Sequence, residues 1–298
     1  MAITKATCSL LFYSKKIGVS FKETLMLGRL HLYCSRKDIA DAIEKYKNNE
    51  KEIKDVKFTD EYSEPLFGIL GAEKIDSMDF SSYENASILH DLNLPIGDKL
   101  KNKFTAIVDG GTIEHVFNFP VAIKNCMKAL KVGGHYIGIT PANNQMGHGF
   151  YQFSPELLFR VFSDDNGFKI KKMMINVHAG EDGPWYEVAD PAKVNNRVML
   201  VNNLPVSLMV IAEKVAEKNI FDIIPQQLDY VNTWSAHTSL VENKVQANES
   251  KAKFLYRKLL PNRIKIILRN IYNTLTVEKS KDEFIGDFNP EHFIKTEI

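Results

Sequence analysis

Short apolar runs alternate with helically spaced apolar positions along most of this chain. The clearest case begins at residues 104–108, an apolar run that stops at an aspartate and two glycines. Apolar residues then recur at helical spacing over residues 116–130, and a lysine followed by two glycines ends that helix. Residues 136–139 form a second apolar run. Strands joined by a helical crossover lie parallel, so the residues that follow both strands should meet at one edge of a sheet.

The same two patterns predict further elements on either side of this unit. Strands are expected at residues 23–28, 74–78, 87–90, 168–178 and 204–213, and helices at residues 36–48, 60–70 and 154–162. Strands and helices therefore alternate from about residue 20 to residue 215, which predicts an α/β fold with a doubly wound sheet. We expect residues 1–215 to form this α/β domain and residues 216–298 to form an extension that is partly helical and basic.

The amino-acid composition indicates the broad class of protein to which the chain belongs. The chain is 44% hydrophobic and 25% charged with a net charge of +1, which is typical of a globular protein and gives no general attraction to nucleic acid. Its three cysteines are far apart, which indicates a reducing compartment rather than a disulfide scaffold or a thiolate zinc site. The apolar patch at residues 10–13 is too short for a signal peptide, and no apolar run reaches 18 residues. We expect a cytoplasmic protein.

A basic segment interrupts this even charge distribution. From Lys251 to Asn273 the chain carries seven lysines and arginines and no acidic residue, and its isoleucines and leucine at positions 264, 267, 268 and 271 share one helical face. Two interpretations stay open. The segment could be a helix that packs on the protein with its basic face in water, or it could bind an anionic surface, such as the inner surface of a membrane or a polyanionic substrate.

Three strand ends carry groups that a nucleotide-like ligand could use. Gly28 follows the first strand, where it would let the backbone approach a ligand closely. Asp79 ends the next strand and could bind ribose hydroxyls, and Asp91 follows a third strand and could accept a hydrogen bond from an exocyclic amine. An aspartate after a strand is more often a turn former, so these residues carry weight because they recur at successive strand ends.

Several short stretches resemble one enzyme family over about residues 22–215. They are HDLN (90–93), FTAIVDGGTIEHVFN (104–118), LKVGG (130–134) and the Pro-Ala-Asn that follows at 141–143. Together with Asp79 they look like class I S-adenosylmethionine-dependent methyltransferases. DGGTIEHVFN and GHGFYQFSPE further resemble methyltransferase-like proteins of bacterial surface-polysaccharide and other glycan pathways. The resemblance implies a Rossmann-like methyltransferase sheet that closes with an antiparallel strand pair at residues 168–178 and 204–213.

The resemblance also implies S-adenosylmethionine as the cofactor and places residues around it. The turn at Gly28 and Arg29 would lie against the methionine part of the cofactor. Asp79, with Phe80 beside it, would hold the ribose, and Asp91 with Leu92 would contact the adenine. The segment after residues 104–108 would border both cofactor and substrate; it consists of Asp109, Gly110 and Gly111.

The loop MGHGFYQF and the turn after residue 111 carry candidate catalytic side chains. His148 lies between two glycines in this loop, and an exposed histidine is a reasonable general base for an acceptor hydroxyl during methyl transfer. Tyr151 lies in the same loop. Glu114 and His115 are expected to open the helix at residues 116–130, where a histidine often braces the turn instead of taking part in chemistry.

Two other uses of polar residues stay open. A divalent cation could be held by carboxylate and imidazole groups of Asp109, Glu114, His115 and His148. The spacing of these residues in the sequence matches no metal motif, so we expect no metal. His178 belongs to a polar and aromatic loop between the last two expected strands, which could form the rim of a sugar site or simply pack.

The leading hypothesis is therefore an S-adenosylmethionine-dependent methyltransferase that acts on an oxygen of a sugar or glycan-linked acceptor, or of another small molecule. A methyltransferase-like binding protein that has lost its cofactor is one alternative, because LMLGRLHLYC replaces the glycine-rich loop of the family and 51 residues separate Gly28 from Asp79. A nucleotide-sugar or NAD oxidoreductase is another. Against it, no G-x-G-x-x-G sequence follows a strand and no Tyr-x-x-x-Lys pair lies in a helical stretch.

Overall fold

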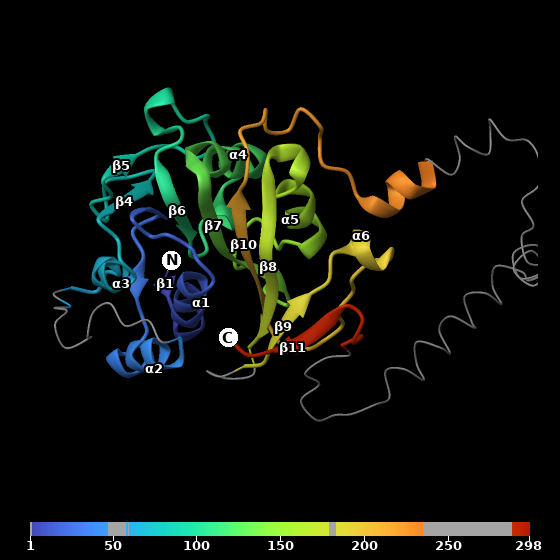
Figure 1. Ribbon diagram of the computed structural model, residues 1–298, viewed down its shortest axis with the longest axis horizontal. Coiled ribbons are helices and arrows are strands. Elements are labelled where there is room, and N and C mark those ends of the chain that lie inside the picture. The colour runs from blue at the N-terminus through green and yellow to red at the C-terminus, as the bar shows by residue number, and fades with distance from the viewer. Residues whose placement is uncertain (1, 47–57, 59, 179–182, 235–287) are drawn as a thin grey trace, which may run out of the picture.

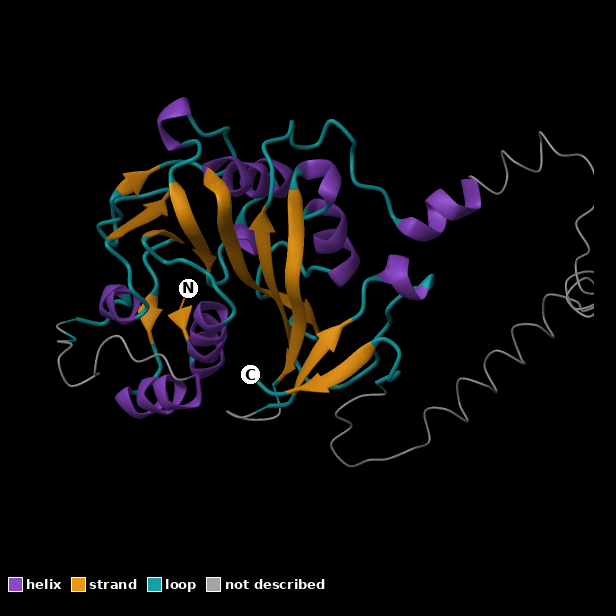
Figure 2. Ribbon diagram, in the orientation of Figure 1, coloured by secondary structure: helices purple, strands orange, loops and turns teal. Residues whose placement is uncertain are grey.

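The computed structural model describes residues 2–46, 58, 60–178, 183–234 and 288–298. Within these residues the main feature is a nine-stranded sheet with helices on both faces (Figures 1 and 2). In spatial order its strands are β11 (Phe293–Thr296), β9 (Trp185–Val188), β8 (Phe168–Val177), β10 (Val206–Lys214), β7 (Leu130–Asn143), β6 (Phe104–Asp109), β2 (Glu23–Leu27), β4 (Lys74–Asp79) and β5 (Ile88–Leu89).

Strand direction confirms the doubly wound α/β sheet. Strands β7, β6, β2, β4 and β5 run parallel to one another, whereas β10 lies antiparallel between β7 and β8. This is the Rossmann-like arrangement with a final antiparallel pair that the sequence resemblance implied. The chain runs from β2 outward to β4 and β5 and then returns to β6 on the other side of β2, so the switch in strand order falls between β2 and β6. Ligands of open α/β sheets bind at such a point.

Alternating side chains along each strand pack into two separate cores. Leu25 and Leu27 of β2 belong to the core beneath α4 (Phe119–Ala129) and α5 (Pro155–Val161), whereas Met26 belongs to the opposite core. That second core is covered by α1 (Lys5–Lys16), α2 (Arg36–Tyr46) and α3 (Glu64–Ile69), which lie at the left in Figure 1. Because both faces are covered, central strands such as β6 and β10 read as largely apolar runs in the sequence.

The N-terminal region differs from the sequence prediction, which recognised only a short apolar patch there. Helix α1 begins after Thr4, whose hydroxyl accepts a hydrogen bond from the backbone N–H of Thr7. A parallel two-stranded sheet joins β1 (Ala2–Ile3) to β3 (His31–Leu32), directly after the β2 turn. Along the chain, strand β3 and helices α2 and α3 come between β2 and β4. They account for part of the long separation between Gly28 and Asp79.

The bounds of several other helices and strands also differ from those expected from the sequence. The helix expected at residues 116–130 begins at Phe119, after a 3₁₀ turn, η3 (Ile113–His115), because Pro120 is suited to the first turn of a helix. Strand β7 is much longer than the four residues predicted for it. The segment expected to be a loop after residue 178 contains β9 and α6 (Pro191–Val194). The helix expected at residues 154–162 is confirmed as α5, which the Ser154 hydroxyl caps by accepting from the N–H of Leu157 at 3.3 Å.

The chain also returns to the sheet after the two strands that the sequence analysis took to be the last. Strand β11 pairs antiparallel with β9, and Lys45 Nζ donates a hydrogen bond to the carbonyl oxygen of Ile298. A division of the chain at residue 215 stays a prediction. The basic segment at residues 251–273 lies outside the described residues. Among the helices that are described, none is long and apolar enough to cross a membrane. All three cysteines are described, free and buried.

Candidate active site

Two of the protein's cavities open at the carboxyl edge of the sheet, and His115 lines both of them. The first, of about 460 Å³, lies where β4, β5 and β6 end and contains Asp79 and Asp91; we name it the aspartate cavity. The second, of about 350 Å³, lies beyond β6 and β7 and contains His115, His148 and His178; we name it the histidine cavity. The switch in strand order therefore has a cavity on either side, and the two cavities share His115 in their linings.

The aspartate cavity brings together four of the residues predicted to bind cofactor. Asp79, Phe80, Asp91 and Leu92 all line it. One carboxylate oxygen of Asp79 accepts from the N–H of Ser81 at 3.0 Å. One oxygen of Asp91 accepts two hydrogen bonds from Asn93, and these bonds lower the pKa of Asp91. The second oxygen of each carboxylate makes no hydrogen bond to any described residue, so it is free to accept one from a ligand.

Gly28 and Arg29 lie outside both cavities. The N–H of Gly28 donates to the carbonyl oxygen of Met78 at 2.7 Å, which extends the ladder between β2 and β4. The Arg29 guanidinium stacks over the ring of Tyr62 and pairs with Glu64 at 2.6 Å, so helix α3 and its approach hold this side chain. The turn predicted to touch the methionine part of a cofactor is thus occupied by contacts within the protein.

Asp109, Gly110 and Gly111 have different environments although they are consecutive. Asp109 is fully buried and accepts a 2.7 Å hydrogen bond from the Tyr136 hydroxyl, so its carboxylate points into the protein. Burial raises the pKa of Asp109 to about 6, against the opposing effect of the hydrogen bond from Tyr136. Gly110 and Gly111 line the histidine cavity, and the Leu30 side chain packs directly against Gly110.

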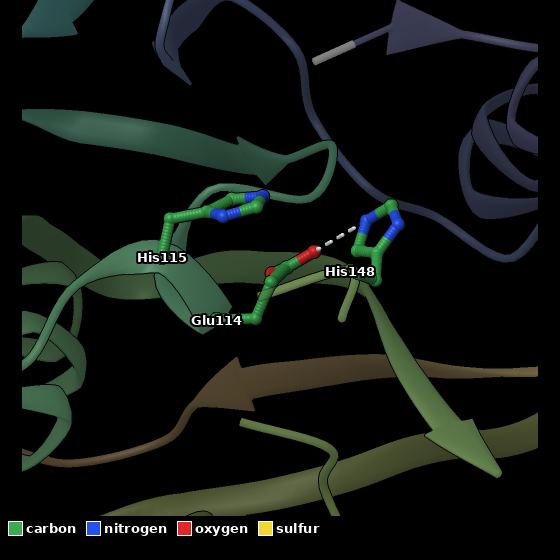
Figure 3. A group of neighbouring side chains, drawn as sticks. All are labelled: Glu114, His115 and His148. Carbon is green, nitrogen blue, oxygen red and sulfur yellow. Dashed lines mark ion pairs between the residues drawn. The ribbon is translucent and has the colours of Figure 1, made fainter. Parts of the chain in front are cut away.

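Three predicted residues converge in the histidine cavity: Glu114, His115 and His148. Figure 3 shows the two imidazole rings on either side of the Glu114 carboxylate, with His115 and Glu114 from the η3 turn and His148 from the loop after β7. The ring centres of the histidines are 5.6 Å apart, and His148 Nε2 is 3.6 Å from Glu114 Oε1. The sequence placed His148 34 residues from Glu114, and the parallel pairing of β6 with β7 brings them together.

Backbone contacts hold this arrangement. The Glu114 carbonyl oxygen accepts hydrogen bonds from the N–H groups of Phe150 and Tyr151, which fix the loop over the η3 turn. A Cβ at Gly149 would lie 3.0 Å from both the Cγ and the carbonyl oxygen of Glu114, so this close approach suits glycine. Gly111 has a φ of +93°, and a Cβ there would lie 3.0 Å from the Glu114 carboxylate. Two glycines therefore leave room for one buried glutamate.

The electrostatics of the cluster are dominated by burial. The Glu114 side chain is 1% exposed, and neither carboxylate oxygen has a hydrogen-bond partner among the described residues. Burial raises the pKa of Glu114 to about 8, and the nearby Asp109 contributes to the rise. Burial lowers the pKa of His115, and His148 adds to that effect. His148 itself is 51% exposed at the mouth of the cavity.

Tyr151, the remaining catalytic candidate, lies outside both cavities. Its hydroxyl donates a 2.6 Å hydrogen bond to the carbonyl oxygen of Phe117. Its ring packs against Phe119 and Phe153, which places it in the aromatic packing next to α4. A catalytic role for Tyr151 stays a prediction, but in this structure the side chain holds the loop that carries His148.

The histidine cavity also has a neutral polar wall, of which the sequence pattern indicated only His178. His178 Nε2 lies 2.7 Å from Ser207 Oγ, and the buried hydroxyl of Thr140 has no partner among the residues described. Asn176 and Gln145 complete this wall. Ser207 lies here because β10 is antiparallel, so the start of β10 meets the ends of β7 and β8. In the sequence, the signal for these wall residues was a polar residue at the point where an apolar run begins or ends, as with Ser207 and Asn176.

Glu114, His115 and His148 are also the group that could hold a metal ion. Within the described residues, each offers one ligand atom, and the three atoms lie within 4.8 Å of one another. Asp109, which the sequence analysis grouped with them, is directed toward Tyr136 instead. The chemistry available at this cluster is therefore proton transfer or metal binding.

No protein-family model matches the chain, and no curated protein matches it. Solved structures with a similar fold include TehB from Haemophilus influenzae, with 15% identity, a TM-score of 0.35, and 68% of this chain and 61% of that chain covered. A branched-chain polyamine synthase from Thermus thermophilus has 13% identity and a TM-score of 0.37, with 74% and 59% covered. This chain thus spans about six-tenths of the length of both.

A third similar structure is the 1,6-didemethyltoxoflavin-N1-methyltransferase of Burkholderia thailandensis, with bound S-adenosylhomocysteine. It has 10% identity and a TM-score of 0.36, and the match covers 71% of this chain and 78% of that chain. All three TM-scores are below 0.5, so these similarities assign neither a family nor an activity. The function has to be argued from the residues of the two cavities.

Proposed function

We propose that this protein is an S-adenosylmethionine-dependent methyltransferase that acts on a hydroxyl group of a small molecule, in particular a sugar or glycan-linked acceptor. The observation that carries the proposal is the pair of cavities on either side of the strand switch, which meet at His115. A cofactor and an acceptor that must exchange one group need adjacent sites. A carboxylate-lined cavity next to an imidazole-lined one meets that requirement at the edge of the sheet where ligands bind.

The aspartate cavity fits the adenosine end of the cofactor. Asp79 and Asp91 each keep one free carboxylate oxygen at the cavity, suited to ribose hydroxyls and to the adenine amine, while Leu92 and Val116 offer apolar contact. Its volume of about 460 Å³ lies within the range of small-ligand sites. The bound cofactor would supply an electrophilic methyl group. The protein's part is to hold the adenosine end and to keep the acceptor next to it.

The histidine cavity fits the acceptor. Thr140, Asn176 and the paired His178 and Ser207 offer neutral hydrogen-bonding groups, which suit hydroxyls of an uncharged polar molecule. An alcohol is a weak nucleophile at neutral pH, so its proton must leave as the methyl group arrives. The cluster formed by Glu114, His115 and His148 lies in this cavity, and it either takes the proton or lowers the pKa of the hydroxyl.

Replacing Asp79 with alanine is expected to weaken S-adenosylmethionine binding by about 1.5–3 kcal/mol, the effect of losing a hydrogen bond to a charged group. Asp79 is partly exposed at a strand end, so the fold should remain intact. Isothermal titration calorimetry measures the change. Asp98→Ala is the matched control, because Asp98 is an exposed acid in η2 (Asp98–Leu100), outside the cavity, and pairs with Lys101. Equal affinities for the Asp79 variant and the parent would remove Asp79 from the site.

A methyltransferase-like binding protein without cofactor is the alternative that one specific observation favours. The Gly28 turn is closed by contacts within the protein, and Leu30 packs on Gly110. Calorimetry with S-adenosylmethionine, S-adenosylhomocysteine and NAD separates the possibilities. Binding of the first two alone supports the methyltransferase, binding of NAD alone supports an oxidoreductase, and no binding of any of the three supports the cofactor-free protein.

The basic segment supports a second, separate proposal, peripheral contact with an anionic membrane on the cytoplasmic side. Its seven cations without an acid are the only basis for it. Binding of the full chain to vesicles with anionic lipid should fall steeply with added salt, and should disappear when Arg263, Lys265 and Arg269 are replaced by glutamine. Co-sedimentation with anionic and neutral vesicles measures this. Binding that ignores salt, or equal binding to neutral vesicles, would contradict the proposal.

A further inference from the structure

We propose that Glu114, His115 and His148 form a binding site for a divalent transition-metal ion of the zinc type, with one coordination position open toward the histidine cavity. These residues are the three drawn in Figure 3. Its donor atoms come from the η3 turn and the loop after β7, and two of the three residues, Glu114 and His148, lie outside the aspartate cavity.

The unsatisfied carboxylate of Glu114 is the first observation behind the proposal. The side chain is 1% exposed, and neither oxygen has a hydrogen-bond partner in the described part of the chain. Buried polar groups almost always have partners, and a buried carboxylate without one is strongly unfavourable. The hydrogen bonds from the Phe150 and Tyr151 N–H groups that hold the loop over it go to the Glu114 carbonyl oxygen and not to the carboxylate. A cation between the carboxylate and the imidazoles would satisfy it.

The geometry of the cluster is the second observation. One donor atom from each residue lies within 4.8 Å of the other two, and His148 Nε2 is 3.6 Å from Glu114 Oε1. Ligands bound to tetrahedral zinc at about 2.0–2.1 Å stand roughly 3.3 Å from one another. The 3.6 Å pair is therefore close to the required separation. The exposed imidazoles of His115 and His148 can rotate to close the longer separation, while the buried carboxylate stays fixed between its two glycines.

The donor set selects the kind of metal. Imidazole nitrogen suits zinc, cobalt, nickel and iron, whereas magnesium and calcium prefer sites made only of oxygen. Two histidines and one glutamate make three protein ligands, as in zinc sites that keep a fourth position for water or substrate. The open position faces the histidine cavity, because Glu114 and His148 line that cavity and not the aspartate cavity.

The consequence for catalysis rests on the proposed function. An acceptor hydroxyl bound at the open position would have its pKa lowered by the metal ion. Its O–H bond would break with the proton passing to water at the exposed mouth of the cavity, and the oxygen would keep the electron pair that forms the new bond to the methyl carbon. The methyl group would leave the sulfonium of the cofactor with that sulfur retaining the bonding pair. His148 would then be a ligand instead of the proton acceptor expected from sequence.

Metal binding can be tested on the full chain without cofactor or acceptor. The protein is stripped with a chelator, dialysed, and titrated with Zn²⁺ by calorimetry and with Co²⁺ by visible absorption. We expect one equivalent of each ion to bind, with a cobalt spectrum of low coordination number. Glu114→Gln and His148→Gln should each weaken zinc binding by about 100-fold or more. His178→Gln is the matched control, since His178 lines the same cavity but pairs with Ser207, and it should bind zinc as the parent does.

Three results would each contradict the proposed metal site. The first is an absence of stoichiometric zinc binding by the parent. The second is zinc binding by both Glu114→Gln and His148→Gln that is as tight as the parent's, and the third is a loss of zinc affinity in His178→Gln that is as large as theirs. Circular dichroism establishes that each variant is folded, and the exposure of His148 makes His148→Gln informative even if the buried Glu114 variant misfolds. Failure here leaves S-adenosylmethionine binding untouched, because calorimetry with the cofactor on metal-free protein is a separate measurement. The metal site and the proposed function can therefore fail independently.

Discussion

Replacing His148 with alanine is expected to lower methyl-transfer turnover by about 10²–10⁴-fold, the usual contribution of a positioned proton-transfer group. The loss is expected whether His148 takes the proton or binds a metal ion, because either role activates the acceptor hydroxyl. Cofactor affinity should change little, since His148 lies outside the aspartate cavity. Turnover at saturating acceptor and calorimetric titration with S-adenosylmethionine measure the two quantities separately.

The control for this variant comes from the same loop. Met146 is 95% exposed, and Met146→Ala should keep parental turnover. His115→Ala should behave differently from His148→Ala and impair cofactor binding as well, because its side chain lines both cavities. A folded His148→Ala variant with parental turnover would exclude His148 from the reaction.

Replacing Tyr136 with phenylalanine is expected to lower the free energy of unfolding by about 1–3 kcal/mol at pH 7.5, the effect of leaving a buried polar group without its partner. The Tyr136 hydroxyl donates a 2.7 Å hydrogen bond to Asp109, and both side chains are fully buried. Phenylalanine keeps the ring contact with Phe162 and removes only the donor. Urea unfolding followed by circular dichroism measures the difference.

The effect should depend on pH in a definite direction. Burial raises the pKa of Asp109 from 3.8 to about 6, so the folded protein holds this proton more tightly than the unfolded chain. Asp109 therefore adds no penalty below pH 3.8, and its ionisation lowers stability as the pH rises through about 6. Without the Tyr136 hydroxyl, which favours the charged form, the penalty grows. The difference between variant and parent should thus be larger at pH 7.5 than at pH 5.

Tyr46 provides a matched control for that measurement. Its ring is also buried, but its hydroxyl has no hydrogen-bond partner among the residues the structure describes. Tyr46→Phe should therefore leave stability unchanged or raise it slightly. Equal losses in both variants, or a loss in Tyr136→Phe that does not vary with pH, would show that the Asp109 hydrogen bond does not control the effect.

The sheet could be predicted from the sequence because its strands are buried on both faces. The run at residues 104–108 is apolar apart from Thr105, and an aspartate and two glycines follow where the strand ends. Asp79 and Asp91 lie in one cavity because the ends of neighbouring parallel strands meet, and their role in cofactor binding stays a prediction. Spacing along the strand–helix–strand unit likewise placed Glu114, His115 and His148 at one edge.

Features that depend on distant packing could not be predicted. Helix α1 was missed because its apolar residues Leu10, Leu11 and Phe12 are consecutive and do not show helical spacing, although all three are buried. Strand β11 has four residues and pairs with β9 about a hundred positions earlier, so no local pattern marks it. Gly28 and Asp109 occupy the expected positions in the sheet, but Met78 and Tyr136 engage them.

His115 forms part of the wall of both cavities, and this has a thermodynamic consequence. A ligand that orders or displaces the imidazole in one cavity alters the surface that the second ligand meets. The coupling must be reciprocal, so the factor by which the first changes the affinity for the second equals the factor for the reverse. One exposed side chain is thus enough to couple the binding of the two molecules, without any movement of the sheet.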